Sequence, residues 1–371
     1  MLLLQDKVVC ITGASQGIGR GIALGCARAG AKVVVHHLNT PQATLDAGQV
    51  IADIEKERSG VGLLGPGAVQ VAGDISDECT ADEVRASKLR EGLTMSALAD
   101  DLSELLFAHQ IVQAAVTAFG RIDCCVSNAG VCPFYAFLDI PRGVWRSTRA
   151  INLDGAFYFV QVRKREPDFV MARVLTDRAE GWITQACARQ MKEQIPQGGS
   201  IVAVSSISAL VGGGEQAHYT PTKAGVKSLM ESCAISLAPY KIRCELPAHT
   251  SEGDKSDRMT LMPSKRKCVI GNSVLPGNRC EISVCWLVKL ASELRAVFFP
   301  LHHAGTIETP INAEDLEDPV KRAYMEKRIP LSRLGRPEDL AGPAVFLLSE
   351  MAAYVTGAYV LVDGGAFVNL Q

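Results

Sequence analysis

An apolar run that leads directly into a glycine-rich turn is the feature that most limits how this chain can fold. Residues Lys7 to Ile11 read K-V-V-C-I, a short run with β-branched side chains that is typical of a buried strand. The turn T-G-A-S-Q-G-I-G-R follows at once, and Ile22 to Ala27 then show the apolar spacing of a helix. A second apolar run covers Lys32 to Val35. This order of strand, helix and strand predicts two parallel strands joined by a helix.

The glycines of this turn are spaced for binding a nucleotide. Gly13, Gly17 and Gly19 form the pattern G-x-x-x-G-x-G between the strand and the helix. Because glycine has no Cβ atom, the backbone can turn tightly there and approach a pyrophosphate, whose charge the helix N-terminus favours. The alternative is a glycine-rich turn that holds no ligand. The order of strand, glycines and helix favours the nucleotide site.

The alternation of strands and helices continues along the chain and predicts its fold class. We expect a doubly wound, Rossmann-type α/β fold, a three-layer sandwich around a parallel sheet of about seven strands, in one domain over residues 1–371. A cofactor should lie across the carboxyl ends of the strands, at the point where the strand order reverses. The strands should begin near residues 7, 32, 68, 122, 200, 242 (resuming at 272) and 358.

Composition excludes several classes of function. A formal net charge of −2 provides no basic surface for nucleic acid or an anionic membrane, and no apolar run reaches the length of a membrane span. The twelve cysteines are scattered without a C-x-x-C pair, which favours reduced thiols and a cytoplasmic location. The seven histidines show no H-x-x-x-H spacing, so we expect no metal site built by the protein.

A tyrosine and a lysine one helical turn apart form the second chemical signature. Tyr219 and Lys223 leave the same face of a helix, and Ser206 lies upstream, just after the apolar run Ile201 to Val204. A hydroxyl, a phenol and an ammonium brought together can move a proton at a carbon that bears oxygen. The lysine charge favours the phenolate, so a group whose ordinary pKa is about 10 can act as a base nearer neutrality.

The order of these motifs resembles that of the short-chain dehydrogenases/reductases. Thr12 to Gly19 match the cofactor loop of that family, and Ser206, Tyr219 and Lys223 match its catalytic side chains. The resemblance extends over nearly the whole chain and is specific because the pieces occur in order. The other matching stretches are G-D-I at 73–75, S-N-A-G at 127–130, I-N-L at 151–153, P-G at 276–277, T-I-E-T-P at 306–310 and G-A-Y-V-L-V-D-G-G at 357–365.

The resemblance implies roles for four catalytic residues. Tyr219 is the base that takes the proton of the substrate hydroxyl, and Lys223 lowers the pKa of the tyrosine and holds the ribose hydroxyls. Ser206 hydrogen-bonds the substrate oxygen, and of three neighbouring serines it alone has the family's separation from the tyrosine. Asn152 positions a water in the proton relay. The alternatives for this asparagine are a helix cap or a surface amide, and the catalytic interpretation is favoured over them.

The resemblance also implies which residues line the cofactor. Asp74 and Ile75 flank the adenine, residues 128–130 line the inner ribose, and Ile307 and Thr309 lie near the nicotinamide amide. Taken alone, Asp74 is equally consistent with a cap of the next segment. The expected cofactor-binding residues are Gly13, Ser15, Gln16, Gly17, Ile18, Gly19, His37, Asp74, Ile75, Asn128, Ala129, Gly130, Tyr219, Lys223, Ile307 and Thr309.

The end of the second strand bears on the choice of cofactor. A carboxylate there would bind the 2′-hydroxyl of the adenosine ribose and repel a 2′-phosphate. Val35 to Thr40 read V-H-H-L-N-T, which contains no carboxylate, and His36 or His37 could contact the phosphate. We therefore expect either NAD or NADP.

A narrower resemblance concerns the substrate. Residues 126–132 (V-S-N-A-G-V-C), 205–213 (S-S-I-S-A-L-V-G-G), 218–225 (H-Y-T-P-T-K-A-G) and 362–371 (V-D-G-G-A-F-V-N-L-Q) are similar to the fungal L-rhamnose 1-dehydrogenases. This resemblance implies oxidation of the sugar at its anomeric carbon to a lactone, the first step of L-rhamnose breakdown. The alternatives are another aldose dehydrogenase, a 3-oxoacyl-carrier-protein reductase, or a chain that binds the cofactor without turnover.

Four stretches interrupt the expected pattern of strands and helices. They cover residues 86–110, 162–185, 245–271 and 278–305, and we expect them to lie outside the core. Because tolerated insertions normally fall in exposed loops, their positions inside helices and a strand suggest introns retained in a gene sequence. Expansion loops that form a cap or a partner surface are the alternative. Without these segments we expect a homo-oligomer, a dimer or tetramer; with them, poor assembly and weak activity.

Overall fold

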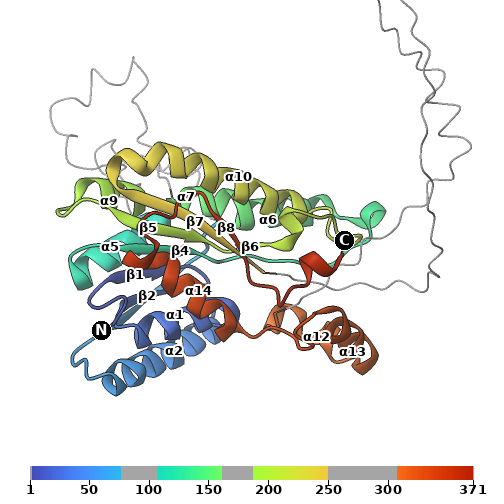
Figure 1. Cartoon of the computed structure of the whole chain (residues 1–371), viewed down its shortest axis with the longest axis horizontal. Coiled ribbons are helices and arrows are strands. Elements are labelled where there is room, and N and C mark those ends of the chain that lie inside the picture. Colours follow the sequence, from blue (N-terminus) through green and yellow to red (C-terminus); the bar gives the residue numbers. More distant parts are fainter. Residues whose placement is uncertain (1, 77–106, 161–186, 250–306, 371) are drawn as a thin grey trace, which may run out of the picture.

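A parallel β-sheet covered by helices on both faces forms the core of the molecule (Figure 1). The computed structural model describes residues 2–76, 107–160, 187–249 and 307–370. Each expected strand begins within two residues of its predicted position, which confirms the Rossmann-type fold. The strands are β1 Val8–Ile11, β2 Lys32–His37, β3 Ala68–Ala72, β4 Cys124–Ser127, β5 Gly199–Ala203, β6 Ser205–Ser206, β7 Ile242–His249 and β8 Tyr359–Leu361.

The strand order creates the crevice in which doubly wound proteins bind their ligands. The sheet runs β3-β2-β1-β4-β5-β7, with β8 and the short β6 both paired to β7, and every pairing is parallel. The chain therefore builds outwards from β1 in one direction and, beginning with β4, in the other. The connections that follow β1 and β4 diverge at the carboxyl edge, and this topological switch point lies where the cofactor was expected.

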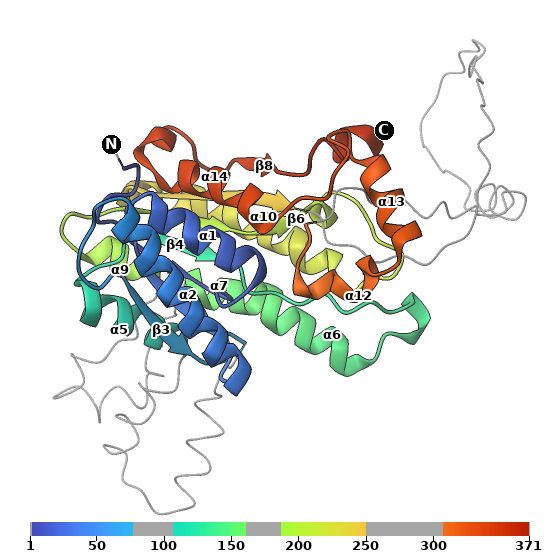
Figure 2. The ribbon, with the colours of Figure 1, turned by 90° about the horizontal axis from the view of Figure 1, so that it is seen from below.

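Alternation along the strands divides the core into two layers. In β1, Val9 and Ile11 join one hydrophobic cluster while Val8 and Cys10 join the other, because successive side chains point to opposite faces. Figures 1 and 2 show the helices of the two layers on opposite sides of the sheet. One layer contains α1 Gly17–Arg28, α2 Pro41–Gly60 and α14 Pro337–Leu348; the other contains α5 Phe107–Phe119, α7 Gly155–Val160, α9 Cys187–Glu193 and α10 Thr220–Leu237.

Shorter helices complete the fold. Helix α6, Arg142–Arg149, passes into a π-helical turn, Ala150–Asp154, which in turn leads into α7. Helices α12, Ala313–Leu316, and α13, Pro319–Arg328, lie beside the carboxyl end of the sheet (Figure 1). In the described parts of the chain, no helix is long and apolar enough to cross a membrane.

Two elements of the structure overlap the predicted inserts. Strand β7 continues through His249, five residues into the segment expected to begin at 245, because Glu245 and Leu246 extend the pairing with β5 and β8. Helix α5 begins at Phe107, before the expected end of the segment 86–110. The predicted restart of a strand at residue 272, Pro276-Gly277 and the segments 162–185 and 278–305 lie outside the described residues.

Candidate functional site

The glycine-rich turn between β1 and α1 leaves backbone space and free helix amides. Gly13 and Gly17 have φ angles of +63° and +53°, a left-handed conformation that side chains with a Cβ atom rarely adopt. A Cβ atom on Gly19 would lie 2.2 Å from the carbonyl oxygen of Gly13. The N-cap residue of α1, Gln16, makes no side-chain capping hydrogen bond. These features fit a pyrophosphate at the helix N-terminus.

Hydrogen bonds from Thr12 and Asn128 join the turn to the loop that follows β4. The Thr12 hydroxyl accepts hydrogen bonds from the backbone N–H groups of Asn128 and Ala129 at 2.9 and 3.0 Å. The Asn128 side-chain amide donates to the carbonyl oxygens of Thr12 and Gly13 at 3.0 and 3.1 Å. Asn128 therefore shapes the glycine loop as well as lining it.

The two histidines at the end of β2 have different environments. In His36, Nδ1 accepts from the Gly13 N–H at 3.1 Å and Nε2 donates to the Gly73 carbonyl at 3.1 Å. Burial lowers the pKa of His36 to about 4, so its ring is neutral and supports the glycine loop. In His37, Nδ1 donates to the Leu38 carbonyl at 2.8 Å, while the buried Nε2 has no partner among the described residues. Of the two, only His37 offers a ring nitrogen to a ligand.

One cavity of about 390 Å³ collects most of the expected cofactor residues. The cavity is also lined by residues at the start of α2 and after β4, among them Thr40, Gln42, Asp46 and Cys132. Sequence reasoning missed these residues because they belong to no recognisable motif. Gly19, Ser206 and Asn152 are not among its lining residues. The expected residues that do line it are Gly13, Ser15, Gln16, Gly17, Ile18, His37, Asp74, Ile75, Asn128, Ala129, Gly130, Tyr219, Lys223, Ile307 and Thr309. The unpartnered His37 nitrogen and the glycine cradle fit a dinucleotide in this cavity.

Asp74 has a local role besides lining the cavity. Its carboxylate accepts hydrogen bonds from the Ser76 N–H at 2.9 Å and the Ser76 hydroxyl at 2.7 Å. It therefore caps the segment after β3, the simpler of the two interpretations of this residue, while it also lies in the cavity.

The tyrosine and the lysine lie together at the start of α10. Tyr219 is the N-cap residue of that helix, and both side chains are almost completely buried. The Lys223 ammonium lies 5.7 Å from the centre of the Tyr219 ring and donates a hydrogen bond to the Val204 carbonyl at 3.1 Å. Burial lowers the pKa of Lys223 to about 8, and the nearby Cys132 acts in the opposite direction by raising it. A buried cation beside a phenol stabilises the phenolate form.

Ser206 lies on the same edge of the sheet, in β6. Its side-chain oxygen accepts a hydrogen bond from the Ser208 N–H at 3.1 Å, so the hydroxyl proton can be donated elsewhere. The backbone carbonyl of Ser206 accepts from the Tyr359 hydroxyl at 2.6 Å, and burial raises the pKa of Tyr359 to about 12, which keeps it a donor. Tyr359, on β8, therefore positions the serine; it lies in the matching stretch 357–365, but the sequence assigned it no role in the site.

Asn152 occupies the π-helical turn and is neither a helix cap nor a surface amide. Its side-chain oxygen accepts from the Val131 N–H at 2.8 Å, and its amide donates to the Val131 carbonyl at 2.9 Å and to the Thr222 hydroxyl at 3.3 Å. These bonds join the loop after β4 to α10, and Asn152 lies next to Gly130, whose Cβ atom would be 3.2 Å from the asparagine oxygen. Most of the hydrogen-bonding capacity of the side chain is therefore structural.

A buried polar cluster beside Tyr219 was also missed by the sequence reasoning. The Gln216 side-chain oxygen accepts from the Ser208 hydroxyl at 3.2 Å, and its amide donates to the Cys132 sulfur at 3.6 Å. The backbone carbonyl of Gln216 accepts from the Tyr219 N–H at 2.8 Å. The side chains of Gln216, Ser208 and Cys132, which we call the polar wall, provide amide, hydroxyl and thiol groups; of the three, Cys132 lines the cavity together with Tyr219.

The fold and the site together define an oxidoreductase that binds a nicotinamide dinucleotide. Residues 62–173, 181–246 and 302–366 match the family described as Enoyl-(Acyl carrier protein) reductase, and residues 7–82 match the short chain dehydrogenase family. The chain belongs to the short-chain dehydrogenase/reductase family, which confirms the resemblance seen in its motifs.

Individual relatives are similar over their full lengths. The L-rhamnose 1-dehydrogenase (NAD(P)(+)) of Azotobacter vinelandii is 42% identical, with all of both chains covered. The L-rhamnose-1-dehydrogenase of the fungus Scheffersomyces stipitis is 39% identical over all of this chain and 99% of its own. Among solved structures, a gluconate 5-dehydrogenase of Burkholderia cenocepacia matches with a TM-score of 0.63 at 20% identity, over 99% of this chain and 97% of its own, and shows the shared fold.

Proposed function

We propose that this protein oxidises L-rhamnose at its anomeric carbon to the lactone, with NAD⁺ or NADP⁺ as hydride acceptor, as the first step of L-rhamnose breakdown. The observation that carries the proposal is the buried Tyr219–Lys223 pair, which opens into the same cavity as the glycine-rich turn. The names and the full-length similarity of the relatives support the sugar. The matching turn and crevice support the cofactor.

The chain's own side chains supply the proton chemistry. A nicotinamide dinucleotide, held by the glycine-rich turn and the loop after β4, would supply the acceptor for the hydride of the anomeric carbon. Tyr219, as the phenolate, takes the proton of the anomeric hydroxyl, and the carbon–oxygen bond becomes the carbonyl of the lactone. The Lys223 ammonium stabilises the phenolate, and the Ser206 hydroxyl donates to the substrate oxygen as charge develops there. Asn152 holds the loop after β4 against α10 and so keeps the phenol and the ammonium in place.

The polar wall is the surface we assign to the remaining sugar hydroxyls. A sugar offers several hydroxyl groups, each both donor and acceptor, and a buried site that pairs them discriminates strongly against analogues that lack one. Gln216 and Ser208 are almost completely buried and bonded to each other, and Gln216 donates to Cys132, which lines the cavity with Tyr219. This arrangement suits a polyhydroxylated substrate better than an apolar acyl chain.

A panel of substrates and a single substitution test the proposal. The purified chain should reduce NAD⁺ or NADP⁺ with L-rhamnose faster than with other aldoses. Replacing the base by Tyr219→Phe should lower kcat by a factor of about 10² to 10⁴. The matched control Tyr354→Phe changes a fully exposed tyrosine and should leave the rate unchanged. An unaltered rate in Tyr219→Phe would overturn the assignment of the base, and no turnover with any sugar would overturn the substrate.

We keep both cofactors in the proposal, since β2 ends in histidine instead of a carboxylate. The neutral Nε2 of His37 can accept a hydrogen bond from a ribose hydroxyl, and its protonated form can donate to a 2′-phosphate. His37→Asp should weaken NADP⁺ binding at least tenfold and spare NAD⁺, because a carboxylate repels the phosphate. Titration of the unchanged protein with each cofactor is the reference. Strong rejection of NADP⁺ by the unchanged protein would contradict this account of the strand end.

We further propose that segments 86–106, 162–185, 250–271 and 278–305 are insertions, with two boundaries corrected by α5 and β7. A chain without them should be more soluble and turn over faster, and should form a homo-oligomer in light scattering. The exposed Ile235 on α10 and Phe157 on α7 support a subunit contact there. Equal activity and equal size of the two chains would contradict the proposal.

The free thiols of the described cysteines support a cytoplasmic site of action.

A further inference from the structure

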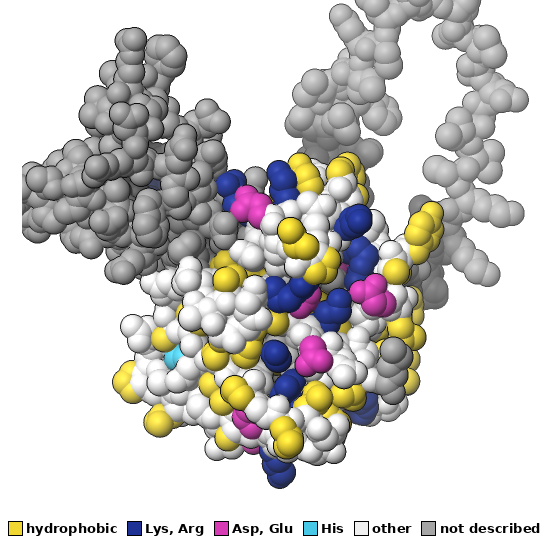
Figure 3. Space-filling model, turned by 90° about the vertical axis from the view of Figure 1, so that its left-hand side faces the viewer, with side chains coloured by type: hydrophobic (Ala, Val, Ile, Leu, Met, Phe, Trp, Pro, Cys, Tyr) yellow, Lys and Arg dark blue, Asp and Glu magenta, His cyan; other side chains and the backbone are white. Residues whose placement is uncertain are grey.

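A second hollow lies at the opposite edge of the sheet, where the parallel strands begin. It encloses about 790 Å³ and is lined by residues that precede or begin β1, β4, β5 and β7 and by the turn after α14. Figure 3 shows this face, with Lys and Arg side chains gathered over its middle and fewer acidic ones among them. The proposed catalytic function uses none of these residues.

The residues that line the hollow carry more positive than negative charge. Lys7, Arg121, Lys241 and Arg243 line it, against the carboxylates of Asp123 and Glu350. A third carboxylate, on Glu245, lies completely buried behind Arg243. Burial raises the pKa of Glu245 to about 7, so it carries only part of its charge near neutrality. The hollow is therefore electropositive.

The two arginines are fixed in place by the fold. Arg121 is paired with Asp123 at 2.8 Å, and the other oxygen of that carboxylate accepts from the Val8 N–H at 2.9 Å. Arg243 donates to Glu245 at 2.8 Å and to two carbonyl groups at the end of α14 at 2.8 and 3.1 Å. These side chains supply a preorganised positive wall and are poor choices for a test, because their removal would leave a buried carboxylate unpaired.

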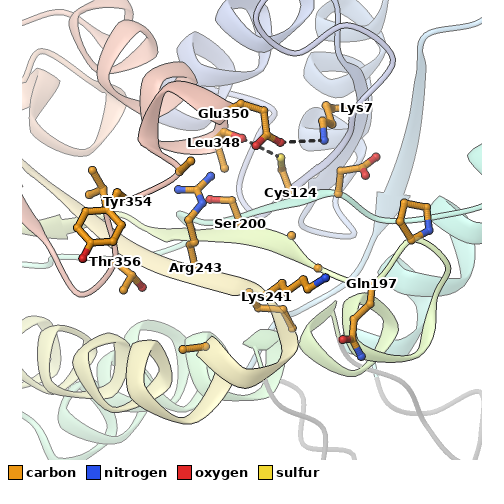
Figure 4. A pocket seen from close by; sticks show the side chains of 18 of the residues that line it. Lys7, Cys124, Gln197, Ser200, Lys241, Arg243, Leu348, Glu350, Tyr354 and Thr356 are labelled. Atoms are coloured by element: carbon orange, nitrogen blue, oxygen red, sulfur yellow. Dashed lines mark hydrogen bonds and ion pairs between the residues drawn. The ribbon is translucent and has the colours of Figure 1, made fainter.

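The two lysines are available to a ligand. The Lys241 amino group has no hydrogen bond or ion pair with any residue in the described part of the chain, and it extends along the hollow towards Gln197 (Figure 4). The Lys7 amino group has one partner among the residues that the structure describes, Glu350 at 3.4 Å, and the Glu350 side chain is 84% exposed. An exposed pair of this kind contributes little stability, so a multivalent anion can displace the carboxylate.

The spacing of the lysines sets the size of the ligand. The strands β1, β4, β5 and β7 are consecutive in the sheet, so three inter-strand steps separate the starts of β1 and β7. At about 4.8 Å per step, the backbones next to Lys7 and Lys241 lie about 14 Å apart. A chain of phosphates spans this distance and can contact both amino groups.

We propose that this hollow binds a chain of phosphate groups, free or carried by a nucleoside, through Lys7 and Lys241 with Arg121 between them. Helices that end at this edge oppose an anion, because their last carbonyl groups carry partial negative charge, so binding depends on the basic side chains of the hollow. The experiment must therefore separate a site from a general electrostatic field. We therefore compare substitutions that remove one exposed charge at the hollow with substitutions that remove one exposed charge of the same sign elsewhere.

Titration calorimetry with inorganic tripolyphosphate, at constant ionic strength, tests the site. The full chain is first saturated with NADP⁺, so that the glycine-rich turn is filled. We expect one tripolyphosphate per chain and a Kd at least tenfold weaker in Lys241→Asn; asparagine tolerates the left-handed backbone of this residue, whose φ is 59°. Lys56→Gln removes the same charge from the exposed face of α2 and should leave Kd unchanged.

A second pair of variants should shift the affinity in the opposite direction. Glu350→Gln frees Lys7 and should strengthen binding several-fold, while Glu317→Gln, which neutralises an exposed carboxylate before α13, should not. A parallel titration with ATP distinguishes the sources: equal affinity assigns the site to the phosphate chain, and tighter binding assigns it to a nucleotide. Absence of binding, or equal effects of the variants at the hollow and their controls, would overturn the proposal. Circular dichroism and thermal unfolding without ligand establish that each variant is folded.

Discussion

Replacing Lys223 by methionine should stabilise the cofactor-free protein while abolishing its activity. The lysine is buried, and among the residues that the structure describes its ammonium donates a hydrogen bond only to the Val204 carbonyl. Methionine has a similar length and carries no charge, so it fills the space without the cost of desolvating an ammonium. The two effects, on stability and on turnover, should therefore have opposite directions.

The pKa of Lys223 sets the magnitude. Burial lowers it from its ordinary 10.5 to about 8, and at about 1.4 kcal/mol per pH unit this corresponds to a penalty of about 3 kcal/mol. Losing the hydrogen bond to Val204 costs about 1 kcal/mol. We therefore expect Lys223→Met to be about 2 kcal/mol more stable than the unchanged protein at pH 7.

The pH dependence distinguishes this account from better packing. Below about pH 8 the lysine is charged in both the folded and the unfolded chain, so the whole penalty is present. Between about pH 8 and its ordinary 10.5, the unfolded chain holds a proton that the folded protein has released, and the stability of the unchanged protein rises with pH. Above 10.5 neither state is charged, and the advantage of methionine is gone.

Urea unfolding of both proteins between pH 7 and pH 10.5, without cofactor, measures this difference. The stability advantage of Lys223→Met should shrink steadily over that range and reverse slightly at its upper end, while sugar oxidation by the variant is lost at every pH. A constant advantage would show that packing and not charge is responsible. A less stable variant at pH 7 would refute the inference that burial of the ammonium is costly.

Two further substitutions test the loop and the serine. Gly19→Ala should weaken NADPH binding at least tenfold in a fluorescence titration, because its Cβ atom would lie 2.2 Å from a backbone oxygen of the turn, whereas Gly48→Ala, with nothing within 4 Å, should have no effect. Tyr359→Phe removes the hydrogen bond to the Ser206 carbonyl and should lower kcat about three- to tenfold with little change in KM, at a cost of about 1 kcal/mol in stability. Tyr354→Phe, at an exposed position, should change neither; equal behaviour of the two tyrosine variants would remove Tyr359 from the site.

The parts of the structure that sequence reasoning predicts are those with a backbone or periodic signal. The strands follow from short apolar runs, and the turn follows from three glycines whose backbone conformations or close contacts exclude other residues. The Tyr219–Lys223 pair follows from helical geometry alone, since residues four apart share a face. Each of these signals is local in the chain, and tertiary contacts strengthen it without changing it.

Contacts between distant segments leave no such signal. The sequence allows either His36 or His37 to contact the phosphate, with only His37 in the expected cofactor set, and the hydrogen bonds of His36 to Gly13 and Gly73 supply the physical difference between them. In the same way, the bond from Tyr359 to Ser206 joins residues far apart in the chain. The role of each residue in a recognised motif therefore depends on its hydrogen bonds to the rest of the protein, because a donor or acceptor bonded there is not available to a ligand.

The same accounting explains why the lysine and not the asparagine is the sensitive member of the site. The Asn152 side chain makes its hydrogen bonds to Val131 and Thr222, which are neutral partners, and it thereby joins the loop after β4 to α10. Among the described residues, the Lys223 ammonium has a single acceptor, which is neutral, and burial lowers its pKa. A buried cation with so little compensation is costly to the fold, and its retention next to a phenol is best explained by what the charge does for that phenol. Activity and stability are in conflict at this residue, and the methionine variant measures that conflict directly.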